Sequence, residues 1–149
     1  MTDKTTAWLR VPLAALGGAM ASSLAIAGVM LVLGSLSSPG MGLLFALTAL
    51  TVAVPIALVH GLLLAVPAYL LIHSRVVLSR RNAMLAGFAI AAVPIALVNY
   101  LPLGAPYDGS IGEQFAQRIG LGGVSGIFGA VGGLAFRWLL RALDPEARA

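Results

Sequence analysis

Two polar side chains, His60 and Asn99, interrupt otherwise apolar stretches of this chain, and each directly follows a copy of the heptapeptide AVPIALV. The repeat places Pro55 and Pro94 five residues before them. Ionisable groups inside apolar helices are rare and costly, and proline-interrupted helices are one way in which transporters build binding sites. These four residues predict a polar site that relays protons or holds a ligand. The structural alternative is that a neutral His60 bonds to Asn99 or to a backbone carbonyl.

Other site chemistry has few groups to use. The chain has 2 histidines and no cysteine, and His60 and His73 lie 13 residues apart, about 140° out of line on one helix, so one regular helix would not present both to a haem. The apolar stretches hold no carboxylate, which argues against small multidrug exporters and di-iron bundles. No phosphate loop and no HExxH motif occur. We therefore expect a non-enzymatic protein with no catalytic residue, metal site or cofactor.

One short motif points to a different chemistry. Residues 123–129 read GVSGIFG, and this is similar to the GxSG nucleophile motif of rhomboid intramembrane proteases. The resemblance covers about ten residues and implies Ser125 as the nucleophile. The catalytic histidine of that family lies on a later helix of a six-helix core, whereas this chain has no histidine beyond His73. A serine without a positioned base is not activated.

Small residues recur at four-residue spacing along 119–140, where they form two neighbouring rows. The rows are Gly122, Gly126 and Ala130, and Ser125, Gly129 and Gly133; Ala14, Gly18 and Ser22 form a weaker row. Such strips let helix backbones approach closely, which is a main source of helix affinity in lipid. The strip predicts packing within the bundle or an interface with another chain, with Gly122, Gly126, Gly129 and Gly133 as the candidate contact residues.

The composition indicates that the apolar stretches of this chain lie in a lipid bilayer. The chain is 60% hydrophobic and 9% charged, with a mean hydropathy of +1.00, whereas soluble domains are about 45–50% apolar and about 25% charged. The net charge of +4 does not form a clustered basic face, so no nucleic-acid partner is expected.

Four stretches are long enough to span the membrane, since about 20 apolar residues cross roughly 30 Å of hydrocarbon. They run over about 12–36, 42–72, 83–103 and 119–140. A secretory signal peptide is the alternative for the first stretch, because Lys4 and Arg10 precede it. Its apolar run is longer than a signal sequence requires. We expect one all-α transmembrane domain over 1–149, a bundle of four helices.

Positive charges give the expected orientation. Only Arg118 of the 9 basic residues falls on the opposite side from the rest: Lys4, Arg10, Arg75, Arg80, Arg81, Arg137, Arg141 and Arg148. The positive-inside rule then places both termini in the cytoplasm, and the expected membrane is the bacterial inner membrane.

Two local features are also expected. The second stretch is longer than a bilayer requires, so it should kink at Pro55 and Pro67 or tilt. The outer loop 104–118 carries Ser110 three residues before Glu113, a capping-box pattern that predicts a short helix leading into the fourth span.

Two functions follow from these features. The leading hypothesis is a non-enzymatic membrane protein that works through helix packing, as a homo-oligomer or as an accessory subunit of a membrane complex. The alternative is a small transporter or pore with its polar site at the kinked second and third helices, which requires a cavity touching His60. A rhomboid-like protease is a third, less favoured function. The expected partners are the lipid bilayer and other membrane subunits or copies of the chain.

Overall fold

The computed structural model describes residues 4–72, 78–98 and 111–143, and nearly all of them are helical. The elements are α1 (Lys4–Ser35), α2 (Pro39–His60), the π-helical turn η1 (Gly61–Ala65), α3 (Val66–Ile72), α4 (Arg80–Val98) and α5 (Ile111–Leu143). Four stretches are long and apolar enough to cross a membrane: Leu9–Ser35, Pro39–Leu71, Arg80–Leu97 and Ile119–Leu143. The predicted all-α class with four such helices is confirmed.

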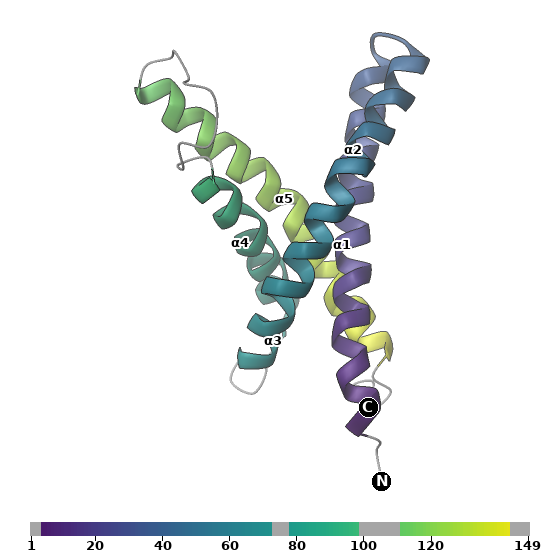
Figure 1. Ribbon diagram of the computed structural model, residues 1–149, viewed down its shortest axis with the longest axis vertical. Helices are drawn as coiled ribbons and strands as arrows, with labels where there is room; N and C mark the ends of the chain where they lie inside the picture. The colour runs from purple at the N-terminus through teal and green to yellow at the C-terminus, as the bar shows by residue number, and fades with distance from the viewer. Residues whose placement is uncertain (1–3, 73–77, 99–110, 144–149) are drawn as a thin grey trace.

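Two hairpins make up the molecule, and they diverge from one another like the arms of a V (Figure 1). In one arm α1 packs against α2, and in the other α4 packs against α5. The arms meet where α1 crosses α5. Within the described part of the chain, α2 and α4 share no extended interface.

Glycines make each of these contacts close. In the first arm, a Cβ atom on Gly34 would lie 2.7 Å from the Gly42 Cα. At the crossing of the arms, a Cβ atom on Gly18 would lie 2.7 Å from the Gly132 carbonyl oxygen. These backbones touch because no side chain stands between them, as expected for helix association in lipid.

Two serines begin the second hydrophobic stretch and the third. The Ser38 hydroxyl accepts a hydrogen bond from the Met41 N–H at 3.2 Å. Pro39 is the first residue of α2, where its missing N–H costs no hydrogen bond. The Ser79 hydroxyl accepts the Asn82 N–H at 3.1 Å at the start of α4. These caps give both helices a defined first turn.

The second membrane stretch departs from α geometry just before Pro67, one of the two predicted kink sites, and not at Pro55. Helix α2 continues through Pro55. The departure lies at η1, where the Val66 N–H donates to the Gly61 carbonyl five residues back. The next residue, Pro67, has no N–H, and its ring clashes with the carbonyl four residues earlier in a regular α-helix, so the wider turn relieves that conflict.

The predicted short outer helix is not a separate element. Helix α5 runs without a break from Ile111 to Leu143, because no proline interrupts this stretch and Gly112 and Gly120 stay helical. The predicted cap, Ser110, lies outside the described residues. At the other end of α5, the Arg137 Nε donates to the Leu78 carbonyl at 2.8 Å, which ties this helix to the segment entering α4.

Candidate functional site

A cavity of about 470 Å³ lies between the two arms of the V. All four long helices line it, together with η1, α3 and Leu78. Its wall is made of alanines, glycines and larger apolar side chains, with no charged residue among those lining it. Its volume lies in the range of about 300–1,000 Å³ that is usual for small-molecule sites.

Two aromatic side chains of the lining contact each other across the arms. The rings of Tyr69 on α3 and Phe136 on α5 pack edge to face, with centroids 5.4 Å apart and an interplanar angle of 71°. Both residues line the cavity. This contact joins α3 of the first arm to α5 of the second.

Among the described residues, His60 is the one histidine that lines this cavity, and no Asp, Glu, Lys or Arg does so. It is half-buried and is the last residue of α2, immediately before the π turn. Eleven residues separate it from Leu71, the end of the membrane stretch, or about 16 Å along a helix, close to the middle of a 30 Å hydrocarbon layer. By this count of residues, His60 lies well inside the candidate membrane stretch.

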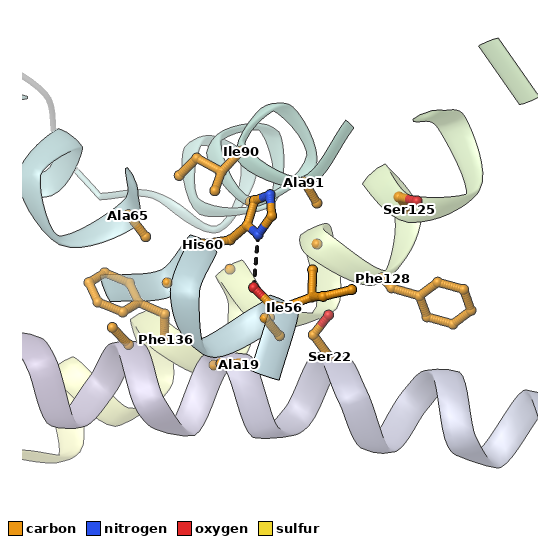
Figure 2. A pocket seen from close by; sticks show the side chains of 18 of the residues that line it. Ala19, Ser22, Ile56, His60, Ala65, Ile90, Ala91, Ser125, Phe128 and Phe136 are labelled. Carbon is orange, nitrogen blue, oxygen red and sulfur yellow. Dashed lines mark hydrogen bonds between the residues drawn. The ribbon is translucent and has the colours of Figure 1, made fainter. Parts of the chain in front are cut away.

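The imidazole is held by its own helix. Its Nδ1 lies 2.8 Å from the Ile56 carbonyl oxygen, one turn earlier. Figure 2 shows the second ring nitrogen at the far side of the ring from that carbonyl. The next residue, Gly61, lies over α1: a Cβ atom there would be 3.5 Å from the Ala15 carbonyl oxygen. A methyl group at Gly61 would therefore make an ordinary van der Waals contact with α1, while His60 lines the cavity.

Three hydroxyl-bearing residues also line the cavity, and their roles differ. Ser125 donates to the Leu121 carbonyl of its own helix at 2.7 Å. Tyr69 belongs to the aromatic contact described above. Ser22 on α1 makes no hydrogen bond within the described chain, unlike its buried neighbour Ser23, which donates to the Ala19 carbonyl at 2.9 Å. Ser22 is thus a second polar group that a ligand would meet.

The structure brings only part of the predicted polar site together. His60 lines the cavity, but neither Pro55 nor Pro94 does. Pro55 is exposed on α2, and Pro94 is half-buried inside α4. Asn99, the predicted partner of His60, and His73, the second candidate haem ligand, lie outside the described residues. The carbonyl alternative for His60 matches its contact with Ile56.

The four glycines proposed as a contact surface on the fourth span pack against α4 of the same chain. A Cβ atom on Gly122 would lie 3.4 Å from the Ala92 carbonyl oxygen, and one on Gly126 would lie 2.5 Å from the Phe88 ring. Gly129 meets the Gly87 backbone, and Gly133 meets the Ala83 carbonyl. Gly132, which directly precedes Gly133, faces α1 instead. A Cβ atom on Gly132 would lie 2.9 Å from the Gly18 carbonyl oxygen.

The rhomboid-like motif gains no base from this geometry. Ser125 and His60 both line the cavity, but the Ser125 hydroxyl bonds to Leu121 and the His60 Nδ1 to Ile56. A nucleophile needs its base within hydrogen-bond reach, and no such bond joins these two side chains across the part of the chain described here. That part also contains no group of three or more His, Cys, Asp or Glu residues able to hold a metal ion.

Two features of the site were missed by sequence reasoning. One is Ser22, which was seen only as a member of a small-residue row. The other is the π turn, for which the sequence does hold a signal: Gly61 directly follows His60, and Pro67 comes about a turn and a half later. A proline that follows an otherwise regular helix must be accommodated upstream, and a wide turn is one solution.

Comparison with known proteins identifies no relative of this chain. No family model, no curated protein and no solved structure matches it.

Proposed function

We propose that this chain is a non-enzymatic integral membrane protein that binds an apolar or amphiphilic molecule between its two helical hairpins and moves it within the membrane. This is the small-transporter class anticipated from His60. The observation that carries the proposal is the cavity of about 470 Å³, which four long helices line and which is apolar apart from His60 and a few hydroxyl groups.

The lining argues for an amphiphile over an ion. An ion that leaves water needs several charged or carbonyl ligands to replace its hydration shell. The residues around this cavity are apolar except for His60, two serines and Tyr69. An aliphatic chain can pack against such apolar walls, and a single polar head can hydrogen-bond to the single imidazole.

The shape of the molecule suggests a route. The arms separate toward the end where α2 and α5 begin (Figure 1), and the Tyr69 and Phe136 rings join the two arms. With both termini in the cytoplasm, as the basic residues suggest, the wide end faces the outer leaflet. The close contact of Gly18 with Gly132 would serve as the pivot about which the hairpins rock, because neither residue has a side chain to unpack.

The alternative function, association with other membrane helices, remains a prediction, but it requires a different contact surface from the α5 glycines. The glycines of α5 that were expected to meet a partner are occupied by α4, so a partner helix would have to dock elsewhere.

A pair of matched variants tests ligand binding. Ile56 lines the cavity, whereas Val59, one turn away on α2, does not, and both side chains are about half exposed, at 46% and 54%. The whole chain is purified in mild detergent, and the co-purifying lipids are extracted and identified by mass spectrometry. We expect Ile56→Trp to lose an amphiphile that wild type and Val59→Trp retain. Equal lipid content in all three proteins contradicts the proposal.

A further inference from the structure

We propose that the occupant of the cavity is a single-chain amphiphile whose head donates a hydrogen bond to the Nε2 atom of His60: a long-chain alcohol or a protonated fatty acid. This inference rests on the proposed function and specifies its ligand. It excludes ethers, esters and ketones as preferred ligands, although their chains would fit the same walls.

The contact with Ile56 fixes which ring nitrogen carries the proton. A carbonyl oxygen can only accept, so a neutral imidazole with Nδ1 at 2.8 Å from it must donate through Nδ1–H. The other nitrogen of a neutral imidazole is then a bare acceptor. A hydrogen bond from one ring nitrogen to a backbone carbonyl is the usual way in which proteins set a histidine tautomer.

The lining offers no charged partner to the ring. No Asp, Glu, Lys or Arg is among the residues that line the cavity, so no counter-charge stabilises an imidazolium there. An unpaired charge in an apolar site carries a large desolvation cost. In the tautomer that the Ile56 contact selects, Nε2 has a lone pair and no proton to offer.

Nothing in the described chain satisfies that lone pair. The one hydrogen bond of the His60 side chain among those residues goes to Ile56, through the other nitrogen. In Figure 2 the Nε2 end of the ring is directed away from that carbonyl. An occupant with a hydroxyl head supplies the missing donor, whereas an ether oxygen would place two acceptors against each other.

The two serines that line the cavity do not discriminate between these ligands. The Ser125 hydroxyl is already engaged with the Leu121 carbonyl. The Ser22 hydroxyl can donate or accept, so it serves an ether as well as an alcohol. Selectivity between donor and non-donor heads therefore falls on His60.

The test uses three dodecyl compounds with the same chain: 1-dodecanol, dodecanoic acid and dodecyl methyl ether. Binding to the full-length chain in mild detergent is measured by native mass spectrometry for wild type, His60→Phe and Ile56→Trp. We expect wild type to bind dodecanol roughly 5- to 100-fold more tightly than the ether, the range for a buried polar group left without its partner. His60→Phe should bind both equally, and Ile56→Trp should bind neither.

The outcomes separate the two proposals. If wild type binds ether and alcohol equally, and Ile56→Trp binds neither, the cavity is a binding site but the donor inference is overturned. If wild type binds none of the three compounds, the proposed function fails and the inference fails with it. Preference for dodecanoic acid over dodecanol assigns the natural head to a carboxylic acid, and the reverse preference assigns it to an alcohol.

A measurement on the wild-type protein alone guards against misfolding of His60→Phe. The chain has 2 histidines, so ¹⁵N-histidine labelling gives two imidazole signal sets. We expect His60 to show the tautomer with a protonated Nδ1 and a bare Nε2, and the Nε2 signal to shift with dodecanol and not with the ether. A protonated Nε2 in the neutral ring overturns the inference.

Discussion

The contact between α4 and α5 predicts that a single methyl group at Gly129 will destabilise the protein. A Cβ atom built at this position would collide with the Gly87 carbonyl oxygen and would lie 2.5 Å from the Ala91 Cβ and 3.0 Å from the Gly87 carbonyl carbon. Two of the three atoms belong to the backbone, so no side-chain rotation relieves the clash. Either the two helices separate or both backbones shift.

Two opposing terms set the size of the effect. Overpacking a close contact costs about 1–3 kcal/mol. Alanine in place of glycine in a helix contributes about 0.5–1 kcal/mol of stability. We therefore expect Gly129→Ala to lower the free energy of unfolding by about 1–2 kcal/mol.

The same helix supplies the control. A Cβ atom on Gly123 would meet no atom within 4 Å. The helix-propensity term is common to Gly123→Ala and Gly129→Ala, so the difference between the two variants isolates the steric term of about 1–3 kcal/mol. Gly123→Ala alone should be about 0.5–1 kcal/mol more stable than wild type.

Reversible unfolding provides the assay. The chain is titrated with sodium dodecyl sulphate in maltoside micelles, and helix content is followed by circular dichroism. The variants are compared at equal protein concentration, because a change in association would make the midpoint depend on concentration. If Gly129→Ala unfolds at the same midpoint as Gly123→Ala, α5 does not approach α4 through this glycine, and the placement of the second arm is refuted.

Three further predictions test the capping, the π turn and the orientation. Ser38→Ala removes the acceptor for the first turn of α2 and should cost about 1 kcal/mol in the same titration; an unchanged midpoint would show that the cap contributes nothing. Pro67→Ala restores the missing N–H donor, so η1 should narrow to α geometry and its amide exchange should slow, with a gain of up to ~3 kcal/mol; unaltered exchange at these amides would mean that the proline does not cause the wide turn. The chain has no cysteine, so Ser37→Cys and Leu143→Cys can be labelled without background: an impermeant maleimide added outside cells should react with the first and not the second, and the reverse pattern would invert the orientation.

The sequence predicted the elements well because the bilayer imposes a length on them. A long run of apolar residues leaves little freedom, which is why all four stretches begin within three residues of their predicted starts, while the predicted end of the third lies outside the described residues. His60 was singled out because an ionisable residue in such a run is rare and costly, and it lines the cavity.

The arrangement of the elements was not predictable in the same way. A strip of glycines shows that a backbone can be approached, but it does not name the approaching helix. Gly129 pairs with Gly87 on α4, whereas Gly132, less than one turn away, pairs with Gly18 on α1. The V shape and its cavity follow from that split between neighbouring glycines, and it depends on three-dimensional packing that no local pattern encodes.

The central claim is that the space between the arms holds an amphiphile with its head at His60. The most direct measurement is an experimental structure of the full chain in lipid nanodiscs, at a resolution that shows bound acyl chains. We expect elongated density between α2 and α4 that ends beside the Nε2 of His60, with Ile56 in contact with it. A structure in which α2 packs directly against α4, with protein side chains filling the space around His60, would contradict the claim.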